Sequence, residues 1–138
     1  MERKEALKIV QEEGLELKNL PAHFKKDRKI VLEAVKSNGP ALEYADKSFR
    51  KDRKFILEAV KQHGGSLECA DKSFKKDKEI VLAAVKNFGS FLQFADESFK
   101  KDRKFILEAV KQDGYALQFV DESLEKDADI LKVANKKK

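Results

Sequence analysis

Two histidines and one cysteine, His23, His63 and Cys69, are the side chains of this sequence best suited to chemistry near neutral pH. His63 and Cys69 lie six residues apart. A Cys–His nucleophile would need these two side chains in direct hydrogen-bond contact and a third group to orient the histidine. A structural zinc site needs four soft ligands at short spacings, which one cysteine and two separated histidines do not supply. The sequence therefore predicts no catalytic residue, no metal site and no cofactor.

The carboxylates recur regularly, whereas a catalytic pair requires an irregular, one-off setting. Glu58 and Glu108 follow Lys54 and Lys104 by four residues, the spacing of exposed ion pairs within one helix. Aspartates that recur every 25 residues are predicted to cap helix N-termini, and they are Asp27, Asp52, Asp77, Asp102 and Asp127. No glycine-rich phosphate loop is present.

Lysines and arginines gather around the predicted N-termini of the long helices, and we name this set the basic ladder. Cations at this end oppose the helix dipole, so helix stability does not explain them. The sequence favours a solvated face neutralised by nearby carboxylates; the alternative is a positive stripe that binds an acidic protein, a polyanion or nucleic acid. Its candidate binding residues are Arg28, Lys29, Arg50, Lys51, Arg53, Lys54, Lys75, Lys76, Lys100, Lys101, Arg103 and Lys104, with Lys25, Lys26 and Lys78 as further members.

Three aromatic residues interrupt the repeat at the turn after a long helix. Phe88, Phe91 and Tyr115 stand where other repeats carry smaller or polar residues. Aromatic side chains anchor protein interfaces, so these three are candidate protein-binding residues. The alternative is that Phe91 packs beneath the turn and Phe88 covers it.

The elements that must position these residues repeat every 25 residues without a gap. A fixed period in this range indicates stacked repeats, each of which needs its neighbours to bury its apolar faces. A second period of 50 appears where Ile30-Val31 alternates with Phe55-Ile56, which suggests paired modules. The aligned glycines are Gly14, Gly39, Gly64, Gly89 and Gly114.

Each module predicts a long helix, a glycine turn and a short helix, and the whole is an all-α solenoid. In the third module Asp52 caps the helix, an apolar stripe runs from Phe55 to Val60, and Gly64 is the expected left-handed C-cap. Cys69 falls at a packing position and His63 at a solvated turn. The prediction is one domain, 1–138, made of an N-terminal capping repeat 1–25, core repeats 26–50, 51–75, 76–100 and 101–125, and a C-terminal capping helix 126–138.

The recurring string DRKFILEAVKQ, followed by a glycine, an Ala-Leu-x-aromatic-Ala turn and a second aspartate, resembles the domain of unknown function family numbered 4116 (DUF4116). The resemblance covers residues 26–125, and the first and last modules depart from it as caps would. It implies a unit near 50 residues and no assigned activity. The chain is more loosely similar to leucine-rich-variant and other short helical repeats used for binding.

Composition bounds the function. The formal net charge is +5, charged residues make up 40% of the chain, and no long apolar run predicts a signal peptide or a membrane span. A single cysteine favours an intracellular location. We therefore expect a non-enzymatic repeat scaffold that binds a protein. A polyanion or nucleic-acid binder, a consensus or designed repeat without a natural partner and, least supported, an enzyme are the alternatives.

Overall fold

The structure is a computed structural model that describes residues 1–136. Every regular element in this range is helical, which confirms the predicted all-α repeat fold. The chain forms two compact units, Met1–Asp71 and a second that begins at Lys72, and each is described by itself. Residues 137–138 of the predicted C-terminal capping helix lie outside the described residues.

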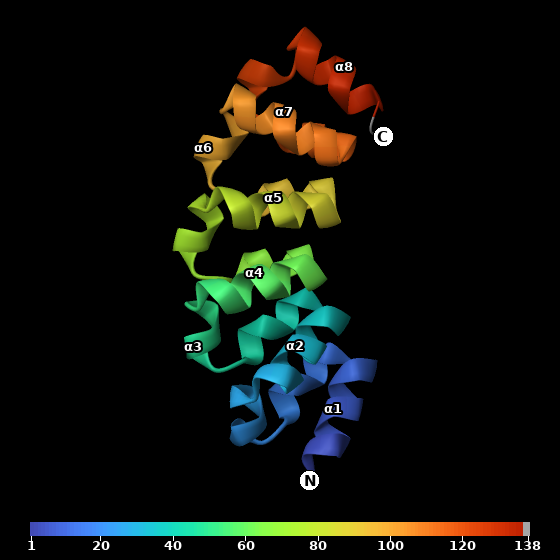
Figure 1. The fold of residues 1–138 in the computed structure, drawn as a ribbon, viewed down its shortest axis with the longest axis vertical. Coiled ribbons are helices and arrows are strands. Elements are labelled where there is room, and N and C mark those ends of the chain that lie inside the picture. Colours follow the sequence, from blue (N-terminus) through green and yellow to red (C-terminus); the bar gives the residue numbers. More distant parts are fainter. Residues whose placement is uncertain (137–138) are drawn as a thin grey trace. The chain divides into compact units, whose positions relative to one another are not determined.

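In the first unit, three ten-residue α-helices, α1, α2 and α4, pack on one another in chain order (Figure 1). The 3-10 helices η1, η3 and η4 form a second layer, because each contacts both the α-helix of its own repeat and its neighbour in this layer. The elements are α1 (Arg3–Glu12), η1 (Gly14–Asn19), η2 (Ala22–Lys26), α2 (Arg28–Ser37), η3 (Gly39–Tyr44), α3 (Lys47–Arg50), α4 (Arg53–Gln62) and η4 (Gly64–Cys69).

The second unit follows the same plan, with α5, α7 and α8 in one layer and η6 and η7 in the other (Figure 1). Its elements are η5 (Lys72–Lys76), α5 (Lys78–Asn87), η6 (Gly89–Phe94), α6 (Glu97–Lys100), α7 (Arg103–Gln112), η7 (Gly114–Phe119), η8 (Glu122–Leu124) and α8 (Ala128–Lys136). A third short helical segment therefore joins consecutive repeats, in addition to the two predicted for each.

Capping and burial explain why these segments are helices. The Asp52 carboxylate accepts from the backbone N–H of Phe55 at 3.2 Å, and Asp102 accepts from Phe105 at the same distance. Each cap satisfies one of the N–H groups that a helix leaves without a partner at its start. On α4 the predicted apolar stripe, from Phe55 to Val60, contributes fully buried side chains. Both expectations are confirmed.

The need for glycine between the long α-helix and the 3-10 helix of each repeat differs from the one predicted. No described glycine has a positive φ, so the left-handed cap expected at Gly64 is wrong. The chain turns instead at the preceding residue, which is extended, as at His63 with φ −154°, and the glycine begins the 3-10 helix. A Cβ on Gly39 would lie 2.6 Å from His63 Nδ1 and 2.7 Å from the Ser66 nitrogen. Glycine is required because neighbouring repeats approach too closely for any side chain.

The 50-residue period has a structural counterpart in each unit. Before α4 the chain makes a single α-turn, α3, and the Phe49 ring packs 4.5 Å from Phe55. Phe99 on α6 packs in the same way 4.4 Å from Phe105. Before α2 the connection is the 3-10 helix η2, and Phe24 is buried. Phe49 and Phe99, which pack against a phenylalanine of the next long helix, are therefore half-exposed, whereas Phe24 is buried.

Gly89→Ala tests the close approach at the glycine. The new methyl would lie 2.6 Å from the Ala116 backbone nitrogen, which no rotamer change relieves. We expect a loss of about 1–3 kcal/mol in the free energy of unfolding, measured by urea denaturation. The matched control is Ser90→Ala, which removes one oxygen from the next residue and adds no volume. Equal stability of the two variants would contradict the explanation.

Candidate functional site

The cysteine and the nearby histidine each already have a partner within the first unit. The Cys69 thiol points to the Pro40 carbonyl oxygen at 3.7 Å, and His63 Nδ1 accepts from the Gly65 N–H at 3.0 Å. Burial raises the pKa of the Cys69 thiol, and the carboxylates of Glu68 and Glu43 raise it further. Because the thiolate is the nucleophile, this setting suppresses its reactivity.

Both side chains differ from what the sequence predicted. His63 is half-buried and caps η4, so its assignment to a solvated turn is wrong. Cys69 is half-buried at the rim of a shallow depression that Pro40 and Arg50 also line, so it is not a core residue. Within residues 1–136 no three histidine, cysteine, aspartate or glutamate side chains converge on a point where a metal ion could bind. None of the described helices has the length and apolar character needed to cross a bilayer.

Cations near the starts of the long helices form ion pairs across repeats. Arg28 on α2 pairs with Glu58 on α4, and its guanidinium lies 5.7 Å from the centre of the Phe55 ring. Lys78 on α5 pairs with Glu108 on α7 at 3.0 Å. Glu58 and Glu108 therefore pair with the preceding repeat, and the prediction that they serve pairs within their own helix is wrong.

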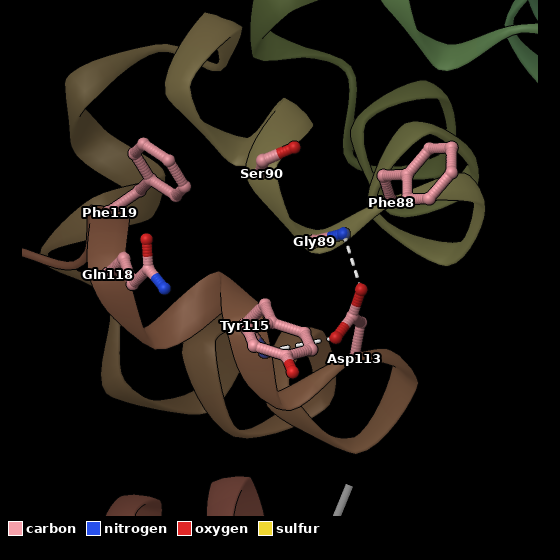
Figure 2. Close-up of a pocket in the computed structure, with 7 residues that line it drawn as sticks. All are labelled: Phe88, Gly89, Ser90, Asp113, Tyr115, Gln118 and Phe119. Atoms are coloured by element: carbon pink, nitrogen blue, oxygen red, sulfur yellow. Dashed lines mark hydrogen bonds between the residues drawn. The ribbon is translucent and has the colours of Figure 1, made fainter. Parts of the chain in front are cut away.

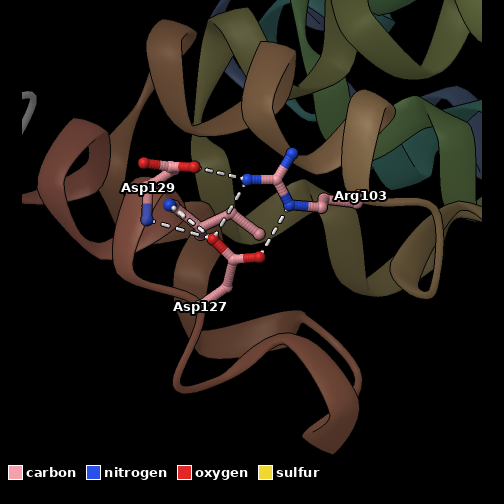
Figure 3. Close-up of polar contacts among 4 residues, drawn as sticks. Arg103, Asp127 and Asp129 are labelled. Carbon is pink, nitrogen blue, oxygen red and sulfur yellow. Dashed lines mark hydrogen bonds and ion pairs between the residues drawn. The ribbon is translucent and has the colours of Figure 1, made fainter.

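Arg103 links α7 to the start of α8 in the same manner. Its Nε lies 2.7 Å from Asp127, and its Nη2 lies 2.6 Å from Asp129 (Figure 3). Asp127 also caps α8, since it accepts from the Ile130 N–H at 3.2 Å. The Arg103 guanidinium is the main reason why the pKa of Asp127 lies below its usual value, and the cap bonds lower it further.

A second group of ladder residues, at the ends of the connecting segments, holds the chain together locally. Lys25 Nζ donates to the Lys18 carbonyl oxygen at 2.9 Å. Lys100 Nζ donates to the Gln93 carbonyl oxygen at 3.2 Å and pairs with Glu97 at 2.9 Å. These amines reach carbonyls in the last turn of a 3-10 helix, where a cation is favourable. Arg50 and Lys75 stand at the corresponding places and are also half-buried.

The remaining ladder residues are exposed. Lys76 and Lys101 lower the pKa of Asp96 and Asp121, although the hydrogen bonds from Ser98 and Ser123 are the larger cause. These lysines therefore lie close enough to Asp96 and Asp121 to stabilise their charged forms. The other exposed members of the candidate set are Lys29, Lys51, Arg53, Lys54 and Lys104.

Two of the three predicted aromatic candidates, Phe88 and Tyr115, line a surface depression in the second unit, which we name the aromatic hollow (Figure 2). Phe88 is 61% exposed and Tyr115 is 52% exposed, although both are large apolar side chains. The hollow has a volume of about 190 Å³. Its lining residues are Phe88, Gly89, Ser90, Asp113, Tyr115, Gln118 and Phe119.

Hydrogen bonds from backbone N–H groups to the Asp113 side chain fix this surface. The Asp113 carboxylate accepts from the Gly89 N–H at 2.7 Å and from the Tyr115 N–H at 3.0 Å, so one side chain joins η6 to η7 (Figure 2). Phe88 is the extended residue that ends α5. Phe91 does not line the hollow; it is half-buried, and its ring meets the Phe88 ring edge-on at 5.8 Å. Phe91 therefore supports the exposed ring.

Among the lining side chains, the sequence analysis missed Ser90, Asp113, Gln118 and Phe119. The repeat contained the signal. Phe119 stands where the repeats of the first unit have Asn19, Tyr44 and Cys69 and the preceding repeat has Phe94, and Gln118 stands where Glu43 and Glu68 carry a charge. The 3-10 helices of the second unit are thus more aromatic and less charged along this edge.

These features define a helical-repeat protein in which one non-repeating aromatic surface is set on a repeating scaffold. The chain belongs to the family described as Domain of unknown function (DUF4116). The family model matches five overlapping segments, residues 3–50, 27–75, 52–100, 77–125 and 102–138. The match includes both terminal repeats, which were expected to depart from the family. No curated protein and no solved structure matches the chain.

The Arg103–Asp127 pair gives a pH dependence of stability. Because the pKa of Asp127 is lowered in the folded state, the pair stabilises the protein above about pH 4 and ceases to do so as the pH falls through the lowered value. Arg103→Gln should therefore lower the melting temperature at neutral pH, and the difference from the parent protein should shrink as the pH falls below about 4. Thermal melts followed by circular dichroism measure this, with Lys104→Gln as the neighbouring control. A constant difference over the whole pH range would refute the coupling.

Proposed function

We propose that this chain is a non-enzymatic scaffold that binds another protein through the aromatic hollow of its second unit. The observation that carries the proposal is the exposure of Phe88 and Tyr115, at 61% and 52%. Leaving two large apolar side chains in water on one small surface is unfavourable, and such surfaces mark interaction sites. Aromatic side chains are also the commonest anchors of protein interfaces.

The rigidity of the hollow supports the proposal. Asp113 ties Gly89 and Tyr115 together, and the Phe91 ring holds Phe88 from one side. Docking on a backbone and a Phe88 ring that are already held in place costs little conformational entropy. The scaffold thus presents the aromatic side chains ready for contact.

The basic ladder is the weaker candidate for binding. Arg28, Lys78 and Arg103 are engaged in ion pairs between repeats, and Lys100 binds within its own turn. Ion pairing between repeats explains why these cations occur at their positions, and no bound ligand is needed to explain them. Exposed pairs of this kind are worth only about 0–1 kcal/mol each, so a polyanion of high charge density would compete with them.

Capture with matched variants tests the proposed site. The double variant Phe88→Asn, Tyr115→Ser uses residues that this chain already carries at the same repeat positions, Asn38 and Ser90. The fold should therefore be retained, as circular dichroism would verify. After chemical cross-linking in lysate of the source cell, we expect the parent protein to capture partners that the double variant loses by about tenfold, as loss of two anchors implies.

The control for capture is the double variant Lys29→Gln, Lys54→Gln, which removes two exposed cations in the first unit. It should capture the same partners as the parent protein. If the aromatic variant captures every protein that the parent captures, the hollow is not a docking site and the proposal fails.

Binding to nucleic acid tests the ladder separately. We expect no gel shift of a duplex DNA at about 150 mM salt, because part of the ladder is already paired between repeats and salt screens the exposed cations. The triple variant Lys29→Gln, Lys54→Gln, Lys104→Gln should behave like the parent protein. A shift that weakens steeply with salt and disappears in the triple variant would favour polyanion binding instead.

A further inference from the structure

The charge in the lining of the aromatic hollow is negative. Asp113 is the charged residue of its lining, and no lysine or arginine lines it. The chain that builds and flanks the hollow, 87–99 and 112–125, contains no lysine or arginine, although the protein carries a net charge of +5. These segments contain the carboxylates Asp96, Glu97, Asp113, Asp121, Glu122 and Glu125.

The corresponding segments of the first unit are not depleted of cations. Segment 37–49 contains Lys47, at the position that Glu97 occupies in the second unit. Segment 62–75 contains Lys72 and Lys75, whose counterparts are Glu122 and Glu125. Aromatic enrichment and the loss of cations therefore occur on the same part of the chain, which gives the hollow an electrostatic preference that the rest of the scaffold lacks.

From this charge complementarity we infer that the aromatic hollow receives an arginine side chain from the partner protein, an inference that rests on the proposed function. A guanidinium is planar, so it stacks on aromatic faces such as those of Phe88 and Tyr115. Its N–H groups can at the same time donate to the Asp113 carboxylate. Each oxygen of that carboxylate accepts one backbone N–H and keeps further acceptor capacity.

The other classes of occupant fit less well. An acidic side chain would meet Asp113 without a compensating cation in the lining. A purely apolar side chain would cover Asp113 and Gln118 and leave their polar atoms without water. Lysine carries a point charge that cannot stack and donate in the same plane. The first unit already contains the favoured contact, because the Arg28 guanidinium lies over the Phe55 ring and pairs with Glu58.

A peptide titration tests the occupant. The probe is a fluorescein-labelled peptide of Arg-Gly-Gly repeats, and its matched control carries citrulline, the neutral isostere, in place of arginine. By fluorescence anisotropy the arginine peptide should bind about tenfold more tightly than the citrulline peptide, with a lysine version between them. Phe88→Asn, Tyr115→Ser and Asp113→Asn should each weaken binding by about three- to fivefold. Lys29→Gln should leave it unchanged.

A second readout locates the peptide. Gly89 and Tyr115 donate their N–H groups to Asp113, so their amide NMR signals should move when a guanidinium reaches that carboxylate. The amide of Gly39 in the first unit should stay in place. Equal binding of the citrulline and arginine peptides, or arginine binding that the three hollow variants do not weaken, overturns the inference.

The two proposals fail differently. If the hollow variants lose cellular partners while arginine and citrulline peptides bind alike, the hollow is an interface and arginine is the wrong occupant. If the hollow variants keep every cellular partner, protein docking at this surface is wrong, whatever the peptides do.

Discussion

Close approach of neighbouring repeats at one glycine is the constraint on which the rest of the structure depends. Where a Cβ would lie 2.6 Å from atoms of the next repeat, as at Gly39 and Gly89, only hydrogen fits. The approach also brings the glycine N–H to a side chain of the following repeat. Gly14 donates to Ser37 at 3.0 Å, and Gly89 donates to Asp113 at 2.7 Å. One short contact therefore sets both the spacing of the repeats and the start of the 3-10 helices.

The ion pairs of the basic ladder follow from this spacing. Because consecutive α-helices within a unit lie side by side, a cation near the start of one faces a carboxylate of the next, as Lys78 faces Glu108 and Arg103 faces Asp127. The positive charge of these cations is unfavourable at the start of their own helix, but a carboxylate of the next repeat compensates it. The apparent conflict in the sequence disappears once the repeats stack.

The sequence predicted the features that depend on period and local chemistry. Helix positions, aspartate caps such as Asp52, and the buried stripe of α4 all follow from spacing within one module. It failed where the partner lies in the next repeat, because spacing along the chain does not specify which neighbours meet. Glu58 pairs backwards with Arg28 for this reason, and His63 is half-buried by packing that its own turn does not reveal.

The site was predictable in part for the same reason. Phe88 and Tyr115 break the repeat and are exposed, so comparing modules found them, whereas the role of Asp113 emerges only when η6 and η7 are placed together. That position holds Glu13, Asn38, His63 and Phe88 in other repeats, and all of these except Phe88 can accept a hydrogen bond. Asp113 thus caps the following 3-10 helix, as Glu13 and His63 do, and adds a negative charge between aromatic side chains. A repeat scaffold acquires a site in this way when one residue keeps a capping role found in other repeats and its neighbours depart from the pattern.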